Sequence, residues 1–138
     1  MRVVFDTNVW VAGLRSRRGA SFALIQRLGS PKFTALVSVP LCLEYEDVLR
    51  RPGVLTGYSA EDITEFLDYF LSVAEESRIH YLWRPYVPDP KDDHVLEVAL
   101  AGSASHIITH NVRDFRDVPR LGISVVTPDQ FLAILSAP

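Results

Sequence analysis

The chain has 138 residues, of which 48% are hydrophobic and 22% are charged, and its formal net charge at pH 7 is −3. This length and composition predict a single globular domain, spanning residues 1–138, with a sizeable buried core. The acidic balance excludes a uniformly basic surface, so a nucleic-acid ligand would need a local basic patch or bound cations.

Cysteine content and hydropathy indicate the compartment. Cys42 is the only cysteine, so an internal disulfide is excluded, and no Cys/His spacing typical of zinc sites occurs. Asp6 interrupts the N-terminal apolar run too early for a signal peptide, and no apolar stretch is long enough to cross a membrane. We therefore expect a cytoplasmic protein without a membrane partner.

The first expected element is a short strand over Val3–Phe5, an apolar run typical of buried parallel strands. Three polar residues follow directly at its end: Asp6, Thr7 and Asn8. An ionised Asp is costly to bury unless it is paired, hydrogen-bonded or metal-bound. Taken alone, Asp6 is explained by capping of the next helix or turn, so its role depends on whether other acids reach the same end of the sheet.

A basic loop is expected just past the first strand. It contains three arginines that are close together in the sequence: Arg15, Arg17 and Arg18. If the loop lies near the Asp6 end of the strand, the guanidinium groups are suited to binding phosphates. Clusters of this kind are more often solvated loops, so both interpretations stay open.

Three further elements lead to the second acid of interest. Small and apolar residues at helical spacing predict a helix that begins near Ala20 and ends at Gly29. A second strand is expected at Thr34–Val37, and Ser38 then caps a helix over Pro40–Arg51.

The helix expected at 40–51 carries Glu44 on or beside its apolar face. Glu44 follows Leu41 by three residues and precedes Val48 by four, which places all three on one side of the helix. A carboxylate beside a buried face, in the first turns of a helix after a strand, would lie near the end of that strand. The other acids of this helix are interpreted as solvent charges: Glu46 and Asp47.

A long amphipathic helix and a third strand are expected next. Ser59 caps the helix, and apolar residues at i, i+3 and i+4 continue it to Ala74. The acids between Glu61 and Glu76 are interpreted as a solvated face. The third strand is expected at Arg78–Trp83. A loop with three prolines follows over 84–93 and cannot form regular structure.

Three acids close the proline-rich loop: Asp89, Asp92 and Asp93. They lead into a nearly all-apolar helix that starts at Val95 and ends at Gly102, which predicts burial of that helix. Helix capping accounts for one acid, because helix N-termini favour anions, but three acids in five residues favour a bound cation. His94 beside them is a candidate ligand, although such a residue is more often a bystander.

The next strand repeats the pattern of the first. It is expected at Ile107–Thr109 and ends in a polar turn that contains Asn111, Arg113 and Asp114. A second strand of the sheet is thus followed by Thr, Asn and Asp.

Strands alternate with helices along the whole chain, and the last pair is a strand at Ile123–Val126 and a helix at 131–135. A capping box of Thr127 and Gln130 starts this helix. The alternation predicts an α/β fold: a three-layer sandwich with a mainly parallel, roughly five-stranded sheet flanked by helices. In such a fold, four acids can reach one rim of the sheet: Asp6, Glu44, Asp93 and Asp114.

Clustered carboxylates repel one another, so either one acid keeps a proton or a hard cation lies among them. Mg²⁺ and Mn²⁺ prefer oxygen ligands, activate bound water and stabilise in-line displacement at phosphorus. Such a cation would also let an acidic protein bind an anionic backbone, with help from arginines. The candidates for phosphate contact are Arg15, Arg17, Arg18 and Arg113, with Arg50 and Arg51 as further candidates.

With these residues assembled, the chain resembles the PIN-domain nucleases, particularly the VapC-like branch described as toxins of toxin–antitoxin systems. The matching segments occur in the family's order and cover almost the whole chain: residues 3–9, 44–52, 89–101 and 109–115. Each segment is weak alone, and together they are a strong match. The resemblance implies a metal-dependent endoribonuclease, using Mg²⁺ or Mn²⁺, that forms a homodimer and is silenced by a cognate antitoxin.

By resemblance, Asp6, Glu44 and Asp93 match the first three catalytic acids of the family, and Asp6 and Asp93 are implied metal ligands. Members differ in whether the fourth acid stands where Asn111 is or where Asp114 is. Because Asn111 is neutral, we assign the acidic, metal-binding role to Asp114 and expect weaker affinity for a second metal. The implied supporting groups are Thr7, Asn8, Thr109 and Asn111.

Two other functions fit parts of the sequence. A PIN-like fold that binds RNA or a protein without cutting would agree with the neutral Asn111, whereas Asp6, Glu44 and Asp93 argue against it. A phosphatase of the haloacid-dehalogenase type also begins with an apolar strand ending in Asp. That chemistry needs a second Asp two residues on, where this chain has Asn8.

Overall fold

The computed structural model of the protein describes residues 1–78 and 92–137, and the side chains of Asp92 and Asp93 lie outside the described part. The expected proline-rich loop over 84–93 therefore falls almost wholly outside it. Within the two described ranges, no helix is long and apolar enough to cross a lipid bilayer.

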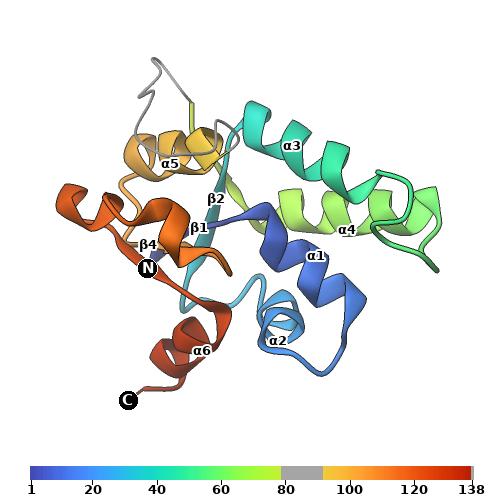
Figure 1. Ribbon diagram of the computed structural model, residues 1–138, viewed down its shortest axis with the longest axis horizontal. Coiled ribbons are helices and arrows are strands. Elements are labelled where there is room, and N and C mark those ends of the chain that lie inside the picture. The colour runs from blue at the N-terminus through green and yellow to red at the C-terminus, as the bar shows by residue number, and fades with distance from the viewer. Residues whose placement is uncertain (79–91, 138) are drawn as a thin grey trace.

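The predicted α/β class is confirmed, because helices flank a central parallel sheet (Figure 1). Val3, Val4 and Phe5 in the first strand are all fully buried. Neighbouring side chains of a strand point to opposite faces, so both faces of the sheet are covered at this strand. This is the expected three-layer arrangement.

The described part of the sheet contains five strands: β1 (Arg2–Phe5), β2 (Thr34–Val37), β3 (Glu75–Glu76), β4 (His106–Ile108) and β5 (Ser124–Val126). Their order is β3-β2-β1-β4-β5, and each neighbouring pair is parallel. The chain thus moves outward from β1 on one side and then crosses back to β4 on the other. In open parallel sheets, ligands bind beyond the carboxyl ends of the strands where the order reverses in this way. Here that point lies between β1 and β4.

The described helices are α1 (Thr7–Arg15), α2 (Ala20–Gln26), α3 (Val39–Leu49), α4 (Ala60–Val73), α5 (Asp92–Ala101), α6 (Pro128–Ser136) and the 3₁₀ helices η1 (Val112–Phe115) and η2 (Val118–Leu121). α5 packs against β1, β2 and β4. Four of its apolar residues, Val95, Leu96, Val98 and Ala99, are fully buried, which confirms the burial expected of this helix. The predicted capping box of Thr127 and Gln130 starts α6.

α1 was not among the expected elements, and it changes the surroundings of Asp6. Asp6 is its N-cap residue, and the Asp6 side chain accepts a hydrogen bond from the Thr7 N–H. β-Branched and aromatic residues such as Val9 and Trp10 favour helices only weakly, so the local pattern did not indicate this helix. Tertiary packing supplies the stability instead, because Val9 and Trp10 are fully buried.

The third strand lies earlier in the chain than the expected Arg78–Trp83. β3 consists of Glu75–Glu76, so these acids belong to a strand and not to the solvated face of α4. β3 is an edge strand with exposed side chains, and its place follows from pairing with β2 and not from an apolar run. Arg2 on β1 forms an exposed ion pair with Glu75. Residues 79–83 of the expected strand lie outside the described part.

An aromatic cluster supports the carboxyl end of β1 from one side. The ring of Trp10 lies 4.6 Å from Phe5, 5.2 Å from Phe70 and 5.8 Å from Tyr45, measured between ring centroids. The buried Tyr45 hydroxyl donates a hydrogen bond to the Phe5 carbonyl, at the last residue of β1. Since β1 ends one residue before Asp6, this packing of α1, α3 and α4 fixes the position of Asp6.

Candidate active site

Asp6 is buried, with 6% of its surface exposed, and several donors from the protein surround its carboxylate. Oδ1 accepts a hydrogen bond of 2.8 Å from the Thr7 backbone N–H. Oδ2 accepts from the Thr109 hydroxyl at 2.7 Å and from the Asn8 side-chain amide at 3.1 Å. These donors satisfy a carboxylate that would otherwise be costly to bury, and they hold it in one orientation.

The ends of β1 and β4 are joined by polar side chains. The Asp6 backbone N–H donates to the Ile108 carbonyl at 2.9 Å, which continues the strand pairing. Asn8 reaches across with both ends of its amide, since Nδ2 lies 3.3 Å from Thr109 Oγ1 and Oδ1 accepts from the His110 N–H at 3.2 Å. Three expected supporting residues, Thr7, Asn8 and Thr109, therefore all contact Asp6.

Asn111, the fourth expected supporting residue, contributes through its backbone. Its N–H donates a hydrogen bond of 3.0 Å to Thr109 Oγ1, which in turn donates to Asp6. Asn111 is exposed, and no contact of its side-chain amide is found in the described part of the chain.

Glu44 lies on the inner side of α3. Its position three residues after the apolar Leu41 predicted this orientation. Its side chain is 10% exposed, whereas that of Glu46 is 46% exposed and pairs with Arg50 at 3.2 Å. The Thr7 hydroxyl donates a hydrogen bond of 2.7 Å to Glu44 Oε2. Thr7 thus binds Asp6 through its backbone and Glu44 through its side chain, so one residue fixes both acids.

His94 takes a part in the site that its sequence position did not reveal. Nδ1 of His94 lies 3.2 Å from Glu44 Oε1, so Thr7 and His94 hold the two oxygens of Glu44 from opposite elements, α1 and α5. Its only signal in the sequence was its place beside Asp93. The contact brings the N-terminal turn of α5 to Glu44, and Asp93 belongs to this turn, although its side chain is outside the described part.

The pKa of Asp6 reflects its burial and the negative charges near it. Burial raises the pKa of Asp6 from its ordinary value of 3.8 to about 6. The hydrogen bonds from Thr109 and Thr7 lower this pKa, and the negative charges of Glu44 and Asp114 raise it. Asp114 is half-buried in η1, and its N–H donates to the Asn111 carbonyl at 3.0 Å.

The described acids offer oxygen donors only, which is the set that Mg²⁺ and Mn²⁺ prefer. A divalent cation would neutralise the charge that raises the pKa of Asp6, so the donor set fits a hard cation. Within the described residues, however, no group of three or more acids, histidines or cysteines converges closely enough to hold a metal by itself. The Asp93 side chain, expected as a ligand, is not among those residues.

Arg15, Arg17 and Arg18 lie at and beyond the end of α1, a helix that was not among the expected elements. α1 leads away from the sheet (Figure 1), and its nine residues span roughly 13 Å. Arg15 at its last residue donates a hydrogen bond of 2.8 Å to the Val54 carbonyl, and Arg17 and Arg18 follow further on. A phosphate-binding role for these three arginines stays a prediction.

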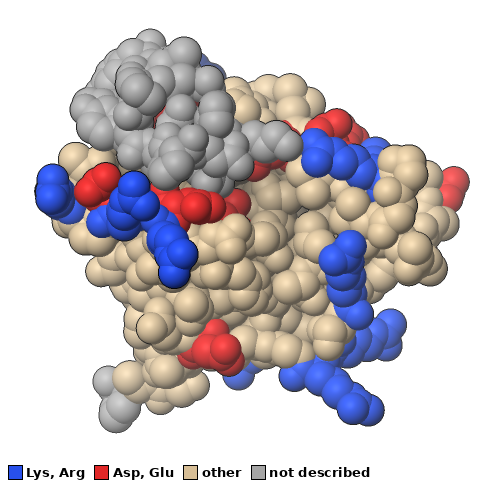
Figure 2. Space-filling model, viewed as in Figure 1, with Lys and Arg blue, Asp and Glu red and all other residues tan. Residues whose placement is uncertain are grey.

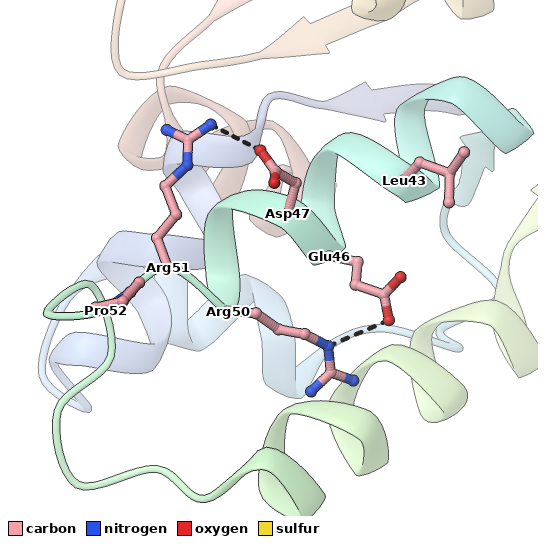
Figure 3. A pocket seen from close by; sticks show the side chains of 6 residues that line it. All are labelled: Leu43, Glu46, Asp47, Arg50, Arg51 and Pro52. Carbon is pink, nitrogen blue, oxygen red and sulfur yellow. Dashed lines mark hydrogen bonds and ion pairs between the residues drawn. The ribbon is translucent and has the colours of Figure 1, made fainter.

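Arg50 and Arg51 are engaged on the outer side of α3. Figure 3 shows the pairs of Arg50 with Glu46 and of Arg51 with Asp47, at 3.2 and 2.7 Å, in a surface pocket that Leu43 and Pro52 also line. Arg50 also donates to the Ala60 carbonyl and the Thr64 hydroxyl of α4. Arg50 thus joins α3 to α4, and Arg51 pairs with an acid one turn before it in the sequence.

Comparison with known proteins agrees with this arrangement. The chain is similar to the VapBC2 structure from Rickettsia felis bound to a DNA fragment from its promoter, with 18% identity, a TM-score of 0.63 and coverage of 92% of this chain and 98% of the other. It is also similar to VapBC-1 from nontypeable Haemophilus influenzae, with 17% identity, a TM-score of 0.64 and coverage of 94% and 99%. At such identities the likeness establishes the fold. No curated protein sequence matches significantly.

A family model gives the family itself. The model described as PIN domain matches residues 2–113, which include β1 to β4, Asp6, Glu44 and the N-terminal turn of α5. The match covers well over half of the chain and confirms the resemblance found in the sequence. The chain belongs to the PIN domain family of nucleases.

Proposed function

We propose that the protein is a metal-dependent endoribonuclease that acts as the toxin of a toxin–antitoxin pair. The observation that carries the proposal is the buried Asp6 carboxylate at the point where the strand order reverses, with its pKa raised by burial and by the charges of Glu44 and Asp114. Membership of a nuclease family supports the reaction class, and the fold shared with VapBC structures supports the toxin assignment.

In this proposal, Asp6, Asp93 and Asp114 hold Mg²⁺ or Mn²⁺, and Glu44 completes the acidic set. When bound, such an ion supplies an activated water and stabilises the charge that develops at phosphorus. The chain's own contribution is orientation: Thr7, Asn8 and Thr109 donate hydrogen bonds to Asp6, and their donors are already in place before substrate arrives.

Glu44 is the proposed proton acceptor within this set. Its Oε2 accepts from the Thr7 hydroxyl and its Oε1 faces His94 Nδ1, so both oxygens are held while free lone pairs remain. An ionised carboxylate in this position accepts a proton or a hydrogen bond from a water beside Asp6. The low exposure of Glu44 keeps it from being screened by bulk solvent.

The alternatives receive less support. Asn8 donates its amide to Asp6, so the residue two positions after Asp6 holds that carboxylate and cannot act as the general acid of a haloacid-dehalogenase-type phosphatase. A module that binds RNA or protein without cutting is favoured only by the neutral Asn111. The cleavage experiment below separates that module from a nuclease.

The proposed partners follow from the same assignment. They are an RNA substrate, a cognate antitoxin protein and a second copy of the chain, all in the cytoplasm. For the homodimer, an apolar patch supports the proposal: Val39, Leu43 and Leu71 are 61%, 58% and 43% exposed around a pocket that Cys42 and Ala74 also line. A two-fold dimer would place this patch against its own copy and bury it.

Asp6→Asn tests the nuclease directly. It keeps the size of the side chain and its capping oxygen but removes the charge, so we expect the variant to fold and to lose RNA cleavage by at least about 100-fold. Cleavage of a labelled RNA by the wild type should need Mg²⁺ or Mn²⁺ and stop with chelator. Glu46→Gln is the matched control, because this exposed acid lies on the same helix as Glu44 and should leave the rate unchanged. Cleavage that resists both chelator and Asp6→Asn would refute the proposal.

The raised pKa of Asp6 predicts how stability depends on pH in the metal-free protein. Because the folded-state pKa of about 6 exceeds the ordinary value of 3.8, the folded state binds the Asp6 proton more tightly than the unfolded state. The contribution of Asp6 to stability is therefore fully present below about pH 4 and is lost as pH rises through about 6. Between about pH 4.5, which lies inside this interval, and about pH 7, which lies above it, urea denaturation should show a smaller loss of stability in Asp6→Asn than in the wild type. Equal losses in both proteins would contradict the shift.

Leu43→Glu tests the homodimer. A charge on the apolar patch should convert a dimeric wild type into a monomer, because a buried, unpaired carboxylate is strongly unfavourable in an interface. The masses are measured by size-exclusion chromatography with light scattering. Ile134→Glu on α6, another exposed apolar residue, is the control and should stay dimeric. A monomeric wild type, or a dimeric Leu43→Glu, would reject this surface.

A further inference from the structure

A strip of arginines begins at the acidic cluster of Asp6, Glu44 and Asp114 and runs along the surface of η1 and η2. Phe115 and Val118 are almost fully buried, so each 3₁₀ helix is anchored to the core by an apolar residue. The opposite side of the two helices carries Arg113, Arg116 and Arg120, all of them exposed. We refer to these three residues as the arginine strip.

The backbone keeps the strip on one surface. A 3₁₀ helix has three residues per turn, so residues three apart, such as Arg113 and Arg116, project from the same side. Gly122, with φ of +83°, ends η2 in the left-handed conformation that glycine adopts most easily. Figure 2 shows Lys and Arg side chains gathered at the left of the view, over the segment that Figure 1 draws in orange, with Asp and Glu side chains directly beside them.

The guanidinium groups of the strip have no structural task in the described part of the chain. Within residues 1–78 and 92–137, none of the three takes part in an ion pair or a side-chain hydrogen bond. Some other arginines are engaged: Arg2 pairs with Glu75, Arg50 pairs with Glu46, and Arg15 donates to the Val54 carbonyl. Five N–H donors on each strip arginine are therefore available to an external acceptor.

The strip is continuous with the site. Asp114, whose charge raises the pKa of Asp6, lies between Arg113 and Arg116 in the same 3₁₀ turn. Apart from Asp114, which belongs to the acidic cluster, the segment contains one acid, the exposed Asp117. The positive charges therefore outnumber the negative ones here, on a protein whose net charge is −3.

We propose that the arginine strip binds the phosphates of a single-stranded RNA on one side of the scissile bond. This inference rests on the proposed nuclease function and adds the path of the substrate to it. Arginine suits phosphate because its planar group forms two parallel hydrogen bonds to the oxygens. Such contacts hold the backbone without reading the bases, so the strip contributes affinity and position and leaves sequence choice to other groups.

The salt dependence of RNA binding tests the strip. All proteins carry Asp6→Asn to prevent cleavage, and Arg116→Gln and Arg120→Gln are added singly and together. Binding of a fluorescent, unstructured oligoribonucleotide is followed by anisotropy in chelator-containing buffer at increasing KCl. Each lost phosphate contact should reduce the slope of log Kobs against log [KCl] by about 0.7, and the double variant by about 1.4.

Arg27→Gln is the matched control for net charge. Arg27 is exposed at the end of α2, and among residues 1–78 and 92–137 its side chain donates only to the Ala23 carbonyl of its own helix, so its loss should leave the slope unchanged. Circular dichroism melting confirms that every variant is folded. A slope lowered equally by Arg27→Gln, or lowered by Arg17→Gln and Arg18→Gln but not by the strip variants, would overturn the proposal.

The two proposals fail in different ways. If the wild type cuts RNA with Mg²⁺ while the strip variants bind with an unchanged slope, the strip is wrong and the nuclease proposal stands. If the strip variants lower the slope while the wild type does not cut RNA, the strip is right and the nuclease proposal is wrong.

Discussion

The buried carboxylate of Asp6 is the constraint on which the rest of the site depends. A charged group at the carboxyl end of β1 needs compensation, and the chain supplies it from α1 through Thr7 and Asn8 and from the end of β4 through Thr109. These donors do not fully offset the burial and the nearby acids, since the pKa of Asp6 is still raised to about 6. The remaining cost is what a divalent cation would remove, and this is why the acidic cluster agrees with the chemistry of a nuclease family.

The same residue caps a helix and belongs to the candidate site, and these roles are compatible. As N-cap of α1, Asp6 accepts the Thr7 N–H with one oxygen, which leaves the other oxygen for Thr109 and Asn8. Thr7 then extends the arrangement to Glu44, and His94 extends it to α5. Hydrogen bonds around the carboxylates of Asp6 and Glu44 thus hold together three helices, α1, α3 and α5, and the end of the strand β4.

Local chemistry explains which parts of this arrangement could be predicted from the sequence. The apolar strands that end in polar residues, the capping residues and the phase that turns Glu44 inward are all encoded within a few residues. α1 could not be predicted in this way, because its stability comes from packing of Trp10 against Phe5, Tyr45 and Phe70. The edge strand β3 depends on pairing with β2, and the contact of His94 with Glu44 joins residues 50 positions apart. Because α1 was not predicted, the sequence did not show that Arg15, Arg17 and Arg18 lie at and beyond the end of a helix.

In the proposed function the acids of this rim act together on RNA, and Asp93 is the one whose side chain lies outside the described part. The most direct measurement is therefore the mapping of cleavage sites on total RNA with the purified wild type and with Asp93→Asn, in the presence of Mg²⁺. We expect discrete, reproducible cuts by the wild type that disappear with Asp93→Asn, while both proteins show the same melting behaviour by circular dichroism. The same cuts made by both proteins, or no cuts by the wild type, would contradict it.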